Sequence, residues 1–225
     1  MRTLVVVPTH NEADNIADLL DGLARHVPDA DVVVVDDAST DATRSIVTDR
    51  GIRLVERSEK RGLGDAYVFA FRLALAEGYD AVAQIDADLS HDPAVLPTML
   101  DLARRGIDVV IGSRYIPGGA VVGWPRRRTW LSRWGNRYAA IALGLAINDA
   151  TAGFRVYSAS TLRRIDLGAV RAEGYGFQIE MTYRAVAAGC SIVEVPITFR
   201  DRVAGASKMS GNIIREAFLL VTWWA

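Results

Sequence analysis

Short, nearly continuous apolar runs alternate with longer stretches of helical spacing along the first half of the chain. The runs are rich in β-branched residues, as expected for strands covered on both faces. Between them, apolar positions recur at helical spacing, with acids or proline near the start of each stretch and glycine just past most of the ends. The expected strands cover residues 4–7, 32–35, 52–55, 81–85, 109–111 and 192–195, and the expected helices cover 11–25, 41–49, 63–77 and 93–105. This alternation predicts an α/β fold with a Rossmann-like, doubly wound, mostly parallel sheet.

The pattern changes after a flexible loop expected at residues 116–119, which leads into a basic, tryptophan-rich stretch at 124–137. We interpret that stretch as substrate-facing. Further helices are expected at 134–145, 158–165 and 177–188, and residues 151–154 are expected to serve as a helix start or in packing. We predict one catalytic domain over 1–211 and a C-terminal helix over 212–225 that packs on the domain or lies at a membrane interface.

Composition narrows the classes of function. With 225 residues, half of them hydrophobic, the chain is long enough for one well-buried domain. A net charge of −1 argues against a nucleic-acid partner bound by bulk electrostatics. Cys190 is the single cysteine, so it forms no internal disulfide and is expected to be a buried, inert thiol. No signal peptide is visible at the N-terminus, and a cytosolic location is expected.

Two carboxylates follow the expected strand at 81–85. Asp86 and Asp88 lie one residue apart, where ligands bind in an open α/β sheet. Neighbouring acids repel each other, and sharing a divalent cation that also binds substrate phosphates relieves this repulsion. The alternative from the residues alone is a polar strand end with Asp88 capping a turn.

The ends of the first two strands also carry polar side chains. The first strand runs into P-T-H-N-E at 8–12, which lacks the glycine-rich loop of dinucleotide-binding and P-loop proteins. The second ends at Asp36 and Asp37, which are placed to contact a base or ribose. Thr9 or Asn11 could instead be ordinary helix caps.

Four motifs in this order resemble the family 2 inverting glycosyltransferases of the GT-A fold: P-T-H-N-E at 8–12, V-D-D-A-S-T-D at 35–41, R-G-L-G-D-A at 61–66 and D-A-D at 86–88. Later motifs resemble the polyprenol-phosphate (dolichol-phosphate) mannose synthase subgroup: G-S-R-Y at 112–115, W-P at 124–125, T-A-G-F at 151–154, G-F-Q-I-E-M at 176–181 and G-A-S-K at 205–208. The resemblance covers essentially the whole chain.

The resemblance implies a nucleotide-sugar site for GDP-mannose and a metal site for Mg²⁺ or Mn²⁺. Asp88 would be the principal metal ligand, with Asp86 beside it and Ser90 where some relatives have Gln. His10 departs from the residues common at its position. The residues implied to bind the donor are Pro8, His10, Glu12, Asp37, Gly64, Asp86, Asp88 and Lys208.

The acceptor implied by the resemblance is a polyprenyl monophosphate. Its phosphate would be bound by Arg114, Arg128 and Ser132, while Arg202 and Lys208 would lie on a mobile basic loop that closes over the site. Glu180 is assigned loosely to the acceptor side. For Arg126 and Arg127 we prefer a solvated face or contact with anionic lipid headgroups.

The expected reaction is a single inverting displacement that gives β-linked polyprenyl phosphomannose and GDP, with Asp88, Arg114 and Arg128 as catalytic residues. A phosphate monoester is largely ionised at neutral pH, so the acceptor needs no dedicated base. The enzyme would act at the cytoplasmic face of a membrane, through its C-terminal helix or a membrane-anchoring partner protein. Two alternatives stay open: the same chemistry with UDP-glucose, and a noncatalytic scaffold that binds nucleotide sugar or anionic lipid.

Overall fold

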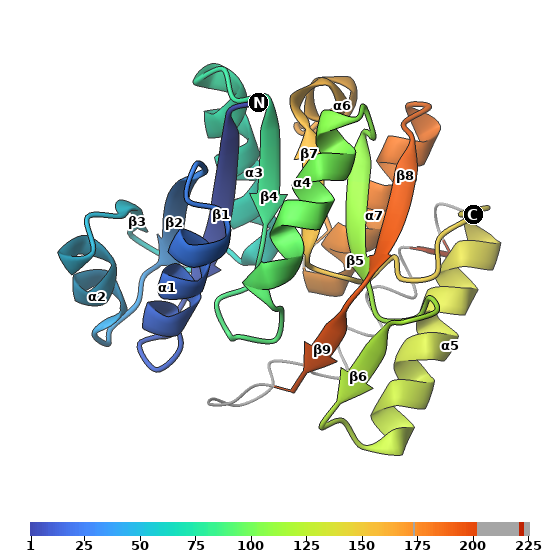
Figure 1. The fold of residues 1–225 in the computed structure, drawn as a ribbon. Helices are drawn as coiled ribbons and strands as arrows, with labels where there is room; N and C mark the ends of the chain where they lie inside the picture. The colour runs from blue at the N-terminus through green and yellow to red at the C-terminus, as the bar shows by residue number, and fades with distance from the viewer. Residues whose placement is uncertain (173, 202–220, 223–225) are drawn as a thin grey trace.

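A seven-stranded sheet forms the centre of the protein (Figure 1) in a computed structural model that describes residues 1–172, 174–201 and 221–222. Its strand order is β3-β2-β1-β4-β7-β5-β8, and β7 alone among these strands runs antiparallel to its neighbours. A separate parallel pair joins β6 to β9. The strands are β1 (Thr3–Thr9), β2 (Asp31–Asp37), β3 (Arg53–Arg57), β4 (Ala81–Gln84), β5 (Val109–Ser113), β6 (Ala120–Val122), β7 (Arg155–Ser158), β8 (Ile192–Pro196) and β9 (Thr198–Arg200).

Helices cover both faces of the sheet, and α1 and α4 lie in front of it in Figure 1 while α3 and α7 lie behind. Two core clusters correspond to these faces, because alternate residues of a strand point to opposite sides. In β1, Leu4 and Val6 pack with α3, whereas Val5 and Val7 pack with α1. The helices are α1 (Ile16–His26), α2 (Thr43–Asp49), α3 (Leu63–Ala76), α4 (Leu96–Arg104), α5 (Arg126–Ala142), α6 (Ala159–Arg164) and α7 (Gly174–Ala187).

The mostly parallel α/β sheet is confirmed, and the differences from the sequence predictions lie at particular elements. The region 151–154 leads into β7, which inserts between β4 and β5, and is not a helix start. Helix α5 begins at Arg126, eight residues before the predicted 134. Helix α1 begins at Ile16 instead of residue 11, because Asn11 adopts a left-handed conformation with a φ of 57°.

The loop at 116–119 is a packed turn. A Cβ at Gly119 would lie 2.7 Å from the carbonyl oxygen of Ser113, so only glycine permits this approach. Cys190 is half-buried, and burial raises the pKa of its thiol, which agrees with an inert, protonated cysteine. Of the predicted C-terminal helix at 212–225, only residues 221–222 are described, and both are helical.

Candidate active site

The turns that follow β1 and β2 are joined by hydrogen bonds into one platform. The backbone N–H of Asn11 donates to Ser39 Oγ at 2.8 Å, and Asn11 Oδ1 accepts from the N–H of Thr40 at 2.8 Å. The N–H of Glu12 donates to Thr43 Oγ1 at 2.9 Å. Asn11 therefore links two turns and does not cap α1. The left-handed conformation of Asn11 and of Ala38, both with a φ of 57°, is held in place by this network.

Asp36 and Asp37 are adjacent, but the surroundings of their carboxyl groups shift the two pKa values in opposite directions. The carboxylate of Asp36 is fully buried and accepts hydrogen bonds from Thr9 at 3.0 Å, from Ser39 and from Arg44 Nε at 2.6 Å. Burial by itself would raise its pKa, but the hydrogen bonds from Ser39 and Arg44 outweigh burial and lower it. Asp36 is thus engaged within the protein, which corrects its expected contact with a base or ribose.

Asp37 is also buried, but burial dominates and raises the pKa of its carboxyl group. Arg57 Nη1 lies 3.0 Å from its Oδ1, and this charge opposes the shift without cancelling it. The raised pKa means that the ionised carboxylate of Asp37 is stabilised less than that of Asp36. Further hydrogen bonds to its charged form would stabilise it, as the N–H groups of a nucleobase can provide.

The other expected donor residues border the same platform. His10 Nδ1 lies 2.6 Å from the carbonyl oxygen of Asp37, and Pro8 is half-buried near the end of β1. Glu12 accepts a hydrogen bond from Asn15 at 3.2 Å. Gly64 is buried in the first turn of α3, the helix whose preceding loop donates backbone hydrogen bonds to Asp37. The structure thus brings the expected residues of the first two turns and of α3 to one edge of the sheet.

Asp86 and Asp88 occupy the turn after β4. Asp86 Oδ1 accepts a hydrogen bond from the buried Tyr67 at 3.1 Å, and His91 Nε2 lies 3.7 Å from Asp86 Oδ2. Asp88 is 5% exposed and its Oδ1 accepts the N–H of Ser90 at 3.1 Å. Leu89 between them has a φ of 59°, a left-handed conformation that a branched side chain rarely adopts. Such a backbone outlier beside two carboxylates is typical of a functional turn.

These groups fit a hard divalent cation. Ser90 is 2% exposed and its Oγ has no hydrogen-bond partner among the described residues, so a polar oxygen is buried unsatisfied beside Asp88. No cluster of three or more His, Cys, Asp or Glu side chains suited to a metal occurs in the described ranges. Mg²⁺ is commonly bound by one or two carboxylates together with substrate phosphates. The protein would therefore supply Asp86, Asp88 and Ser90, and the substrate the remaining ligands.

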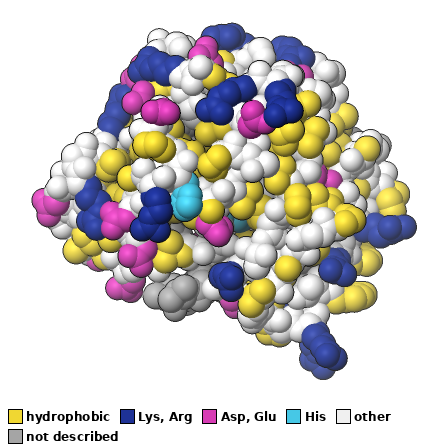
Figure 2. Space-filling model, viewed as in Figure 1, with side chains coloured by type: hydrophobic (Ala, Val, Ile, Leu, Met, Phe, Trp, Pro, Cys, Tyr) yellow, Lys and Arg dark blue, Asp and Glu magenta, His cyan; other side chains and the backbone are white. Residues whose placement is uncertain are grey.

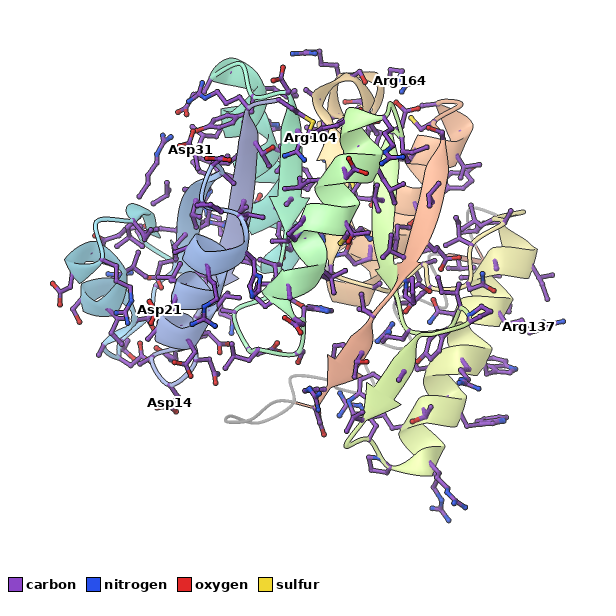
Figure 3. The ribbon with its side chains drawn as sticks, in the orientation of Figure 1. Asp14, Asp21, Asp31, Arg104, Arg137 and Arg164 are labelled. Atoms are coloured by element: carbon purple, nitrogen blue, oxygen red, sulfur yellow. The ribbon has the colours of Figure 1, made fainter. Side chains whose placement is uncertain are left out.

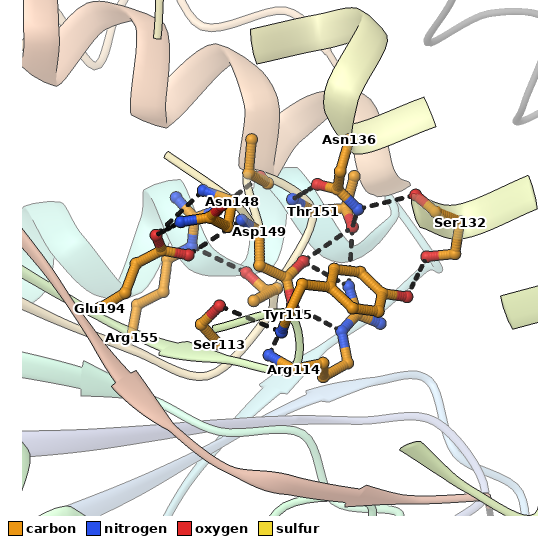
Figure 4. Close-up of polar contacts among 12 residues, drawn as sticks. Ser113, Arg114, Tyr115, Ser132, Asn136, Asn148, Asp149, Thr151, Arg155 and Glu194 are labelled. Carbon is orange, nitrogen blue, oxygen red and sulfur yellow. Dashed lines mark hydrogen bonds and ion pairs between the residues drawn. The ribbon is translucent and has the colours of Figure 1, made fainter. Parts of the chain in front are cut away.

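Arg114 lies at the end of β5 and is 4% exposed (Figure 4). Its Nε and Nη2 donate to the two carboxylate oxygens of the fully buried Asp149 at 2.7 and 2.6 Å, and its backbone N–H donates at 2.9 Å. Nη2 also donates to Thr151 Oγ1 at 2.8 Å. Asp149 occupies the Nε–Nη2 edge of Arg114 and supplies the counter-charge that a buried guanidinium requires. The expected contact of Arg114 with the acceptor phosphate stays a prediction.

Residues 149–153 connect this pair to the carboxylates after β4. At one end Asp149 holds Arg114, and at the other a Cβ on Gly153 would lie 3.0 Å from Asp86 Oδ2. Arg155, which follows this segment at the start of β7, is fully buried. It donates back to the carbonyl oxygens of Ala150 and Ala152 at 2.6 and 2.7 Å. This segment therefore forms a bridge between the end of β5 and the carboxylates after β4.

Sequence reasoning missed Asp149 and Arg155. A signal for Arg155 was present, because Phe154 and Val156 alternate with Arg155 and Tyr157 at the two-residue period of a strand. The pairing of Asp149 with Arg114 had no local signal, since the residues are 35 positions apart.

Arg128 and Ser132 project from α5 toward the same region. Arg128 stacks over Trp124, with its guanidinium carbon 4.0 Å from the ring centroid, and its Nη1 lies 3.3 Å from Asp201 Oδ1. Ser132 Oγ accepts a hydrogen bond from the Tyr115 hydroxyl at 2.7 Å (Figure 4). Because Tyr115 follows Arg114 directly, Ser132 is linked through it to the end of β5. Arg202 and Lys208 lie outside the described residues.

Glu180, which we assigned loosely to the acceptor side, is engaged by groups of the protein. Its carboxylate accepts the backbone N–H groups of Arg171 and Ala172 at 3.1 and 2.8 Å and pairs with Arg184 at 2.7 Å. Its buried charge is therefore satisfied by the loop before α7 and by Arg184 on α7.

The fold and the carboxylates at this edge of the sheet are those of a glycosyltransferase with a GT-A fold. The chain belongs to glycosyl transferase family 2, whose family model matches residues 4–166. It is 48% identical over 229 residues to the undecaprenyl-phosphate mannosyltransferase of Micrococcus luteus, covering 100% of this chain and 94% of that protein. It is 45% identical over 230 residues to the polyprenol monophosphomannose synthase of Mycolicibacterium smegmatis, covering 99% of this chain and 86% of that protein.

Solved structures show the same architecture. Glucosyl-3-phosphoglycerate synthase from Mycobacterium tuberculosis, crystallised with Mn²⁺, UDP and glucosyl-3-phosphoglycerate, matches with a TM-score of 0.76 at 21% identity over 99% of this chain and 79% of that chain. At this identity the match supports the GT-A fold alone. Within the described part of the chain, no helix is long and apolar enough to cross a membrane.

Proposed function

We propose that this protein transfers mannose from GDP-mannose to a polyprenyl monophosphate with inversion, giving β-linked polyprenyl phosphomannose and GDP. Two relatives that match over nearly the whole chain are named undecaprenyl-phosphate mannosyltransferase and polyprenol monophosphomannose synthase, which supports mannose transfer to a polyprenyl phosphate. The structural observation that supports the proposal is the bridge at 149–153, which lies beside Asp86 at one end, where a Cβ on Gly153 would come within 3.0 Å of its Oδ2, and holds Arg114 at the other. A donor diphosphate and an acceptor phosphate bound at these two ends would be held next to each other.

On the donor side, Asp37 would accept hydrogen bonds from the base, with Pro8, His10, Glu12 and Gly64 around the nucleoside. Asp86, Asp88 and Ser90 would hold Mg²⁺ or Mn²⁺, and the bound ion would supply positive charge to stabilise the departing diphosphate. Tyr67 donates a hydrogen bond that orients Asp86, and Gly153 leaves room for the Asp86 carboxylate where a Cβ would lie 3.0 Å from its Oδ2. Arg202 and Lys208, which lie outside the described residues, remain predicted contacts.

On the acceptor side, Arg128 and Ser132 would bind the lipid phosphate. We assign Arg114 a positioning role here. Its pair with Asp149 fixes the bridge at 149–153 to the end of β5, where the adjacent Tyr115 donates a hydrogen bond to Ser132. A phosphate oxygen attacks the anomeric carbon, the bond from that carbon to the diphosphate breaks, and the electron pair leaves with GDP. The nucleophile has a second pKa near 6, so it is already ionised at neutral pH. The chain's contribution is positioning and charge stabilisation.

The test is to incubate the purified full chain with Mg²⁺ or Mn²⁺ and a polyprenyl phosphate, supplying labelled GDP-mannose or UDP-glucose in parallel. We expect label from GDP-mannose alone to enter the organic phase. Label from UDP-glucose would keep the chemistry and change the donor, and donor binding without transfer would support a scaffold.

A pair of variants tests the carboxylate site. Asp88→Asn is expected to lower transfer by roughly 100-fold or more, as for the loss of a group that stabilises developing charge. Asp92→Asn is the matched control, since Asp92 carries the same charge nearby but only caps the short helix after it. Transfer by Asp88→Asn at the control rate would exclude the metal assignment.

A further inference from the structure

An aromatic side chain of β9 lies between the two halves of the candidate site. The ring of Phe199 packs edge-to-face with the ring of His91, with centroids 5.3 Å apart, and with the ring of Trp124 at 5.1 Å. This is an arrangement that aromatic pairs favour. His91 belongs to the turn after β4, and Trp124 lies against Arg128. We call the three rings the aromatic wedge: His91, Phe199 and Trp124.

At one end, the wedge is packed against the carboxylate turn. His91 is 3% exposed, its ring centroid lies 5.2 Å from that of the fully buried Phe154, and its Nε2 lies 3.7 Å from Asp86 Oδ2. The backbone of β9 is bonded to the same turn, because the N–H of Arg200 donates to the carbonyl oxygen of Ser90 at 3.1 Å. In Figure 1, β9 accordingly lies between β6 and the loop that leads into α4. Packing and a backbone hydrogen bond thus fix β9 to this turn.

At the other end, the wedge holds Arg128. The guanidinium carbon of Arg128 lies 4.0 Å from the centroid of the Trp124 ring. Asp201 Oδ1 accepts a hydrogen bond from Trp124 Nε1 at 3.2 Å and lies 3.3 Å from Arg128 Nη1. Gly123 has a φ of 90°, and a Cβ there would lie 3.0 Å from the Cβ of Asp201, so this approach to the end of β9 favours glycine. Arg137 on the same helix instead points away from the body of the protein (Figure 3).

The two ends of the wedge carry opposite charge. Arg114 adds a second guanidinium at the basic end, with its carbon 5.4 Å from the centroid of the Phe199 ring, within the range of a cation–π contact. Residues 126–142 contain five arginines and no Asp or Glu, and Figure 2 shows basic and hydrophobic side chains mixed at the lower right, over α5. The wedge therefore separates an acidic turn, suited to a metal ion, from a basic region suited to a phosphate.

We propose that Phe199 is a positioning residue for the transfer reaction, and that its ring is the spacer that sets the distance between the carboxylate turn and Arg128. The inference rests on the proposed function, in which this turn binds the donor diphosphate through a metal ion and Arg128 binds the acceptor phosphate. A misplacement of about 1 Å between reacting groups can cost roughly 100-fold in rate. Without the Phe199 ring, His91 and Trp124 can move toward each other, while each substrate keeps its own contacts.

The first experiment compares the steady-state kinetics of Phe199→Ala and Phe199→Leu with wild type, at a temperature where circular dichroism shows each to be folded. For Phe199→Ala we expect kcat to fall roughly 10- to 100-fold while the KM values for GDP-mannose and polyprenyl phosphate each change by less than about threefold. Phe199→Leu keeps a bulky apolar side chain and should recover part of the rate.

Two control variants separate positioning from a general loss of structure. Val122→Ala changes the paired strand β6 at a side chain that is 46% exposed. Leu162→Ala removes a side chain from the core, where Leu162 is 1% exposed on α6, and should lower the melting temperature. Both controls should keep the wild-type kcat when folded. A fall in kcat for Leu162→Ala equal to that for Phe199→Ala would overturn the inference.

The second experiment measures the spacing itself and needs no transfer. The full chain is mixed with Mn²⁺, GDP and a short-chain polyprenyl phosphate, and the relaxation of the acceptor phosphorus is followed by NMR. Bound Mn²⁺ speeds this relaxation with the inverse sixth power of the distance, so a shift of about 1 Å should change the rate roughly twofold in Phe199→Ala. Val122→Ala should match wild type, and the phosphorus nuclei of GDP are an internal control that should not change.

The outcomes distinguish the spacer from the reaction that it serves. Equal relaxation of the acceptor phosphorus in wild type and Phe199→Ala would overturn the role of Phe199. Absence of any effect of Mn²⁺ on the acceptor phosphorus in wild type would overturn the proposed function itself, because donor and acceptor would then not share one site.

Discussion

The buried pair of Arg114 and Asp149 leads to a quantitative prediction about stability. Replacing Asp149 with Asn keeps the volume of the side chain but removes the charge that balances a guanidinium only 4% exposed. Three hydrogen bonds from Arg114, at 2.6, 2.7 and 2.9 Å, converge on this carboxylate. Breaking a buried pair by removing one partner costs about 3–5 kcal/mol, because the other charge stays buried without compensation. For a chain of this size that corresponds to a fall in melting temperature of roughly 6–20 °C.

The assay is urea denaturation followed by circular dichroism for Asp149→Asn, Arg114→Met and the double variant. We expect the loss in the double variant to be smaller than the sum of the single losses by about 2 kcal/mol, since neither charge is then left alone. Asp101→Asn is the control, because Asp101 pairs with Arg105 at 2.7 Å while both side chains are about half exposed or more. That exposed pair should contribute less than about 1 kcal/mol to the free energy of unfolding.

Two results would refute this reasoning. One is an Asp149→Asn variant as stable as the Asp101→Asn control, and the other is strict additivity in the double variant. Steady-state kinetics distinguish a positioning role of the Arg114–Asp149 pair from a direct contact of Arg114 with the phosphate. At a temperature where the variants are folded, loss of the pair should raise the KM for polyprenyl phosphate, because Tyr115 and Ser132 are then misplaced. The KM for GDP-mannose should change less.

Three further predictions follow from other contacts. Gly153→Ala should slow transfer roughly 10- to 100-fold with little change in melting temperature, because its Cβ would lie 3.0 Å from Asp86 Oδ2 and displace it; Gly135→Ala, with open space at its Cβ, is the control. Asp36 has a lowered pKa, so its stabilisation is present above the unfolded value near 3.8 and is lost as pH falls through the lower folded value. Urea denaturation from neutral pH to about pH 3 should therefore show a smaller loss of stability for Asp36→Asn than for wild type, and equal losses would contradict this assignment. Glu180→Gln should lower the melting temperature without changing the KM for GDP-mannose or for polyprenyl phosphate. A rise in the KM for polyprenyl phosphate alone would instead support a place for Glu180 in the acceptor site.

Much of the fold could be predicted because its determinants are local. The apolar runs of β1, β2 and β4 are buried on both faces, and such strands show in the sequence as nearly continuous apolar segments. The polar residues that follow them, including Asp37, Asp86 and Asp88, lie at the carboxyl edge because parallel strands end on the same side of a sheet. The sequence alone thus determined the α/β class and the location of the candidate donor site.

Tertiary structure decided how each polar side chain is used. Asp36 and Asp37 are neighbours in the chain, yet hydrogen bonds lower the pKa of one and burial raises that of the other. The partner of Arg114 comes from a segment 35 residues away, held there by β7, whose antiparallel insertion no local pattern required. Burial, counter-charge and the direction of a strand depend on residues distant in sequence, so these features arise only when the chain is folded.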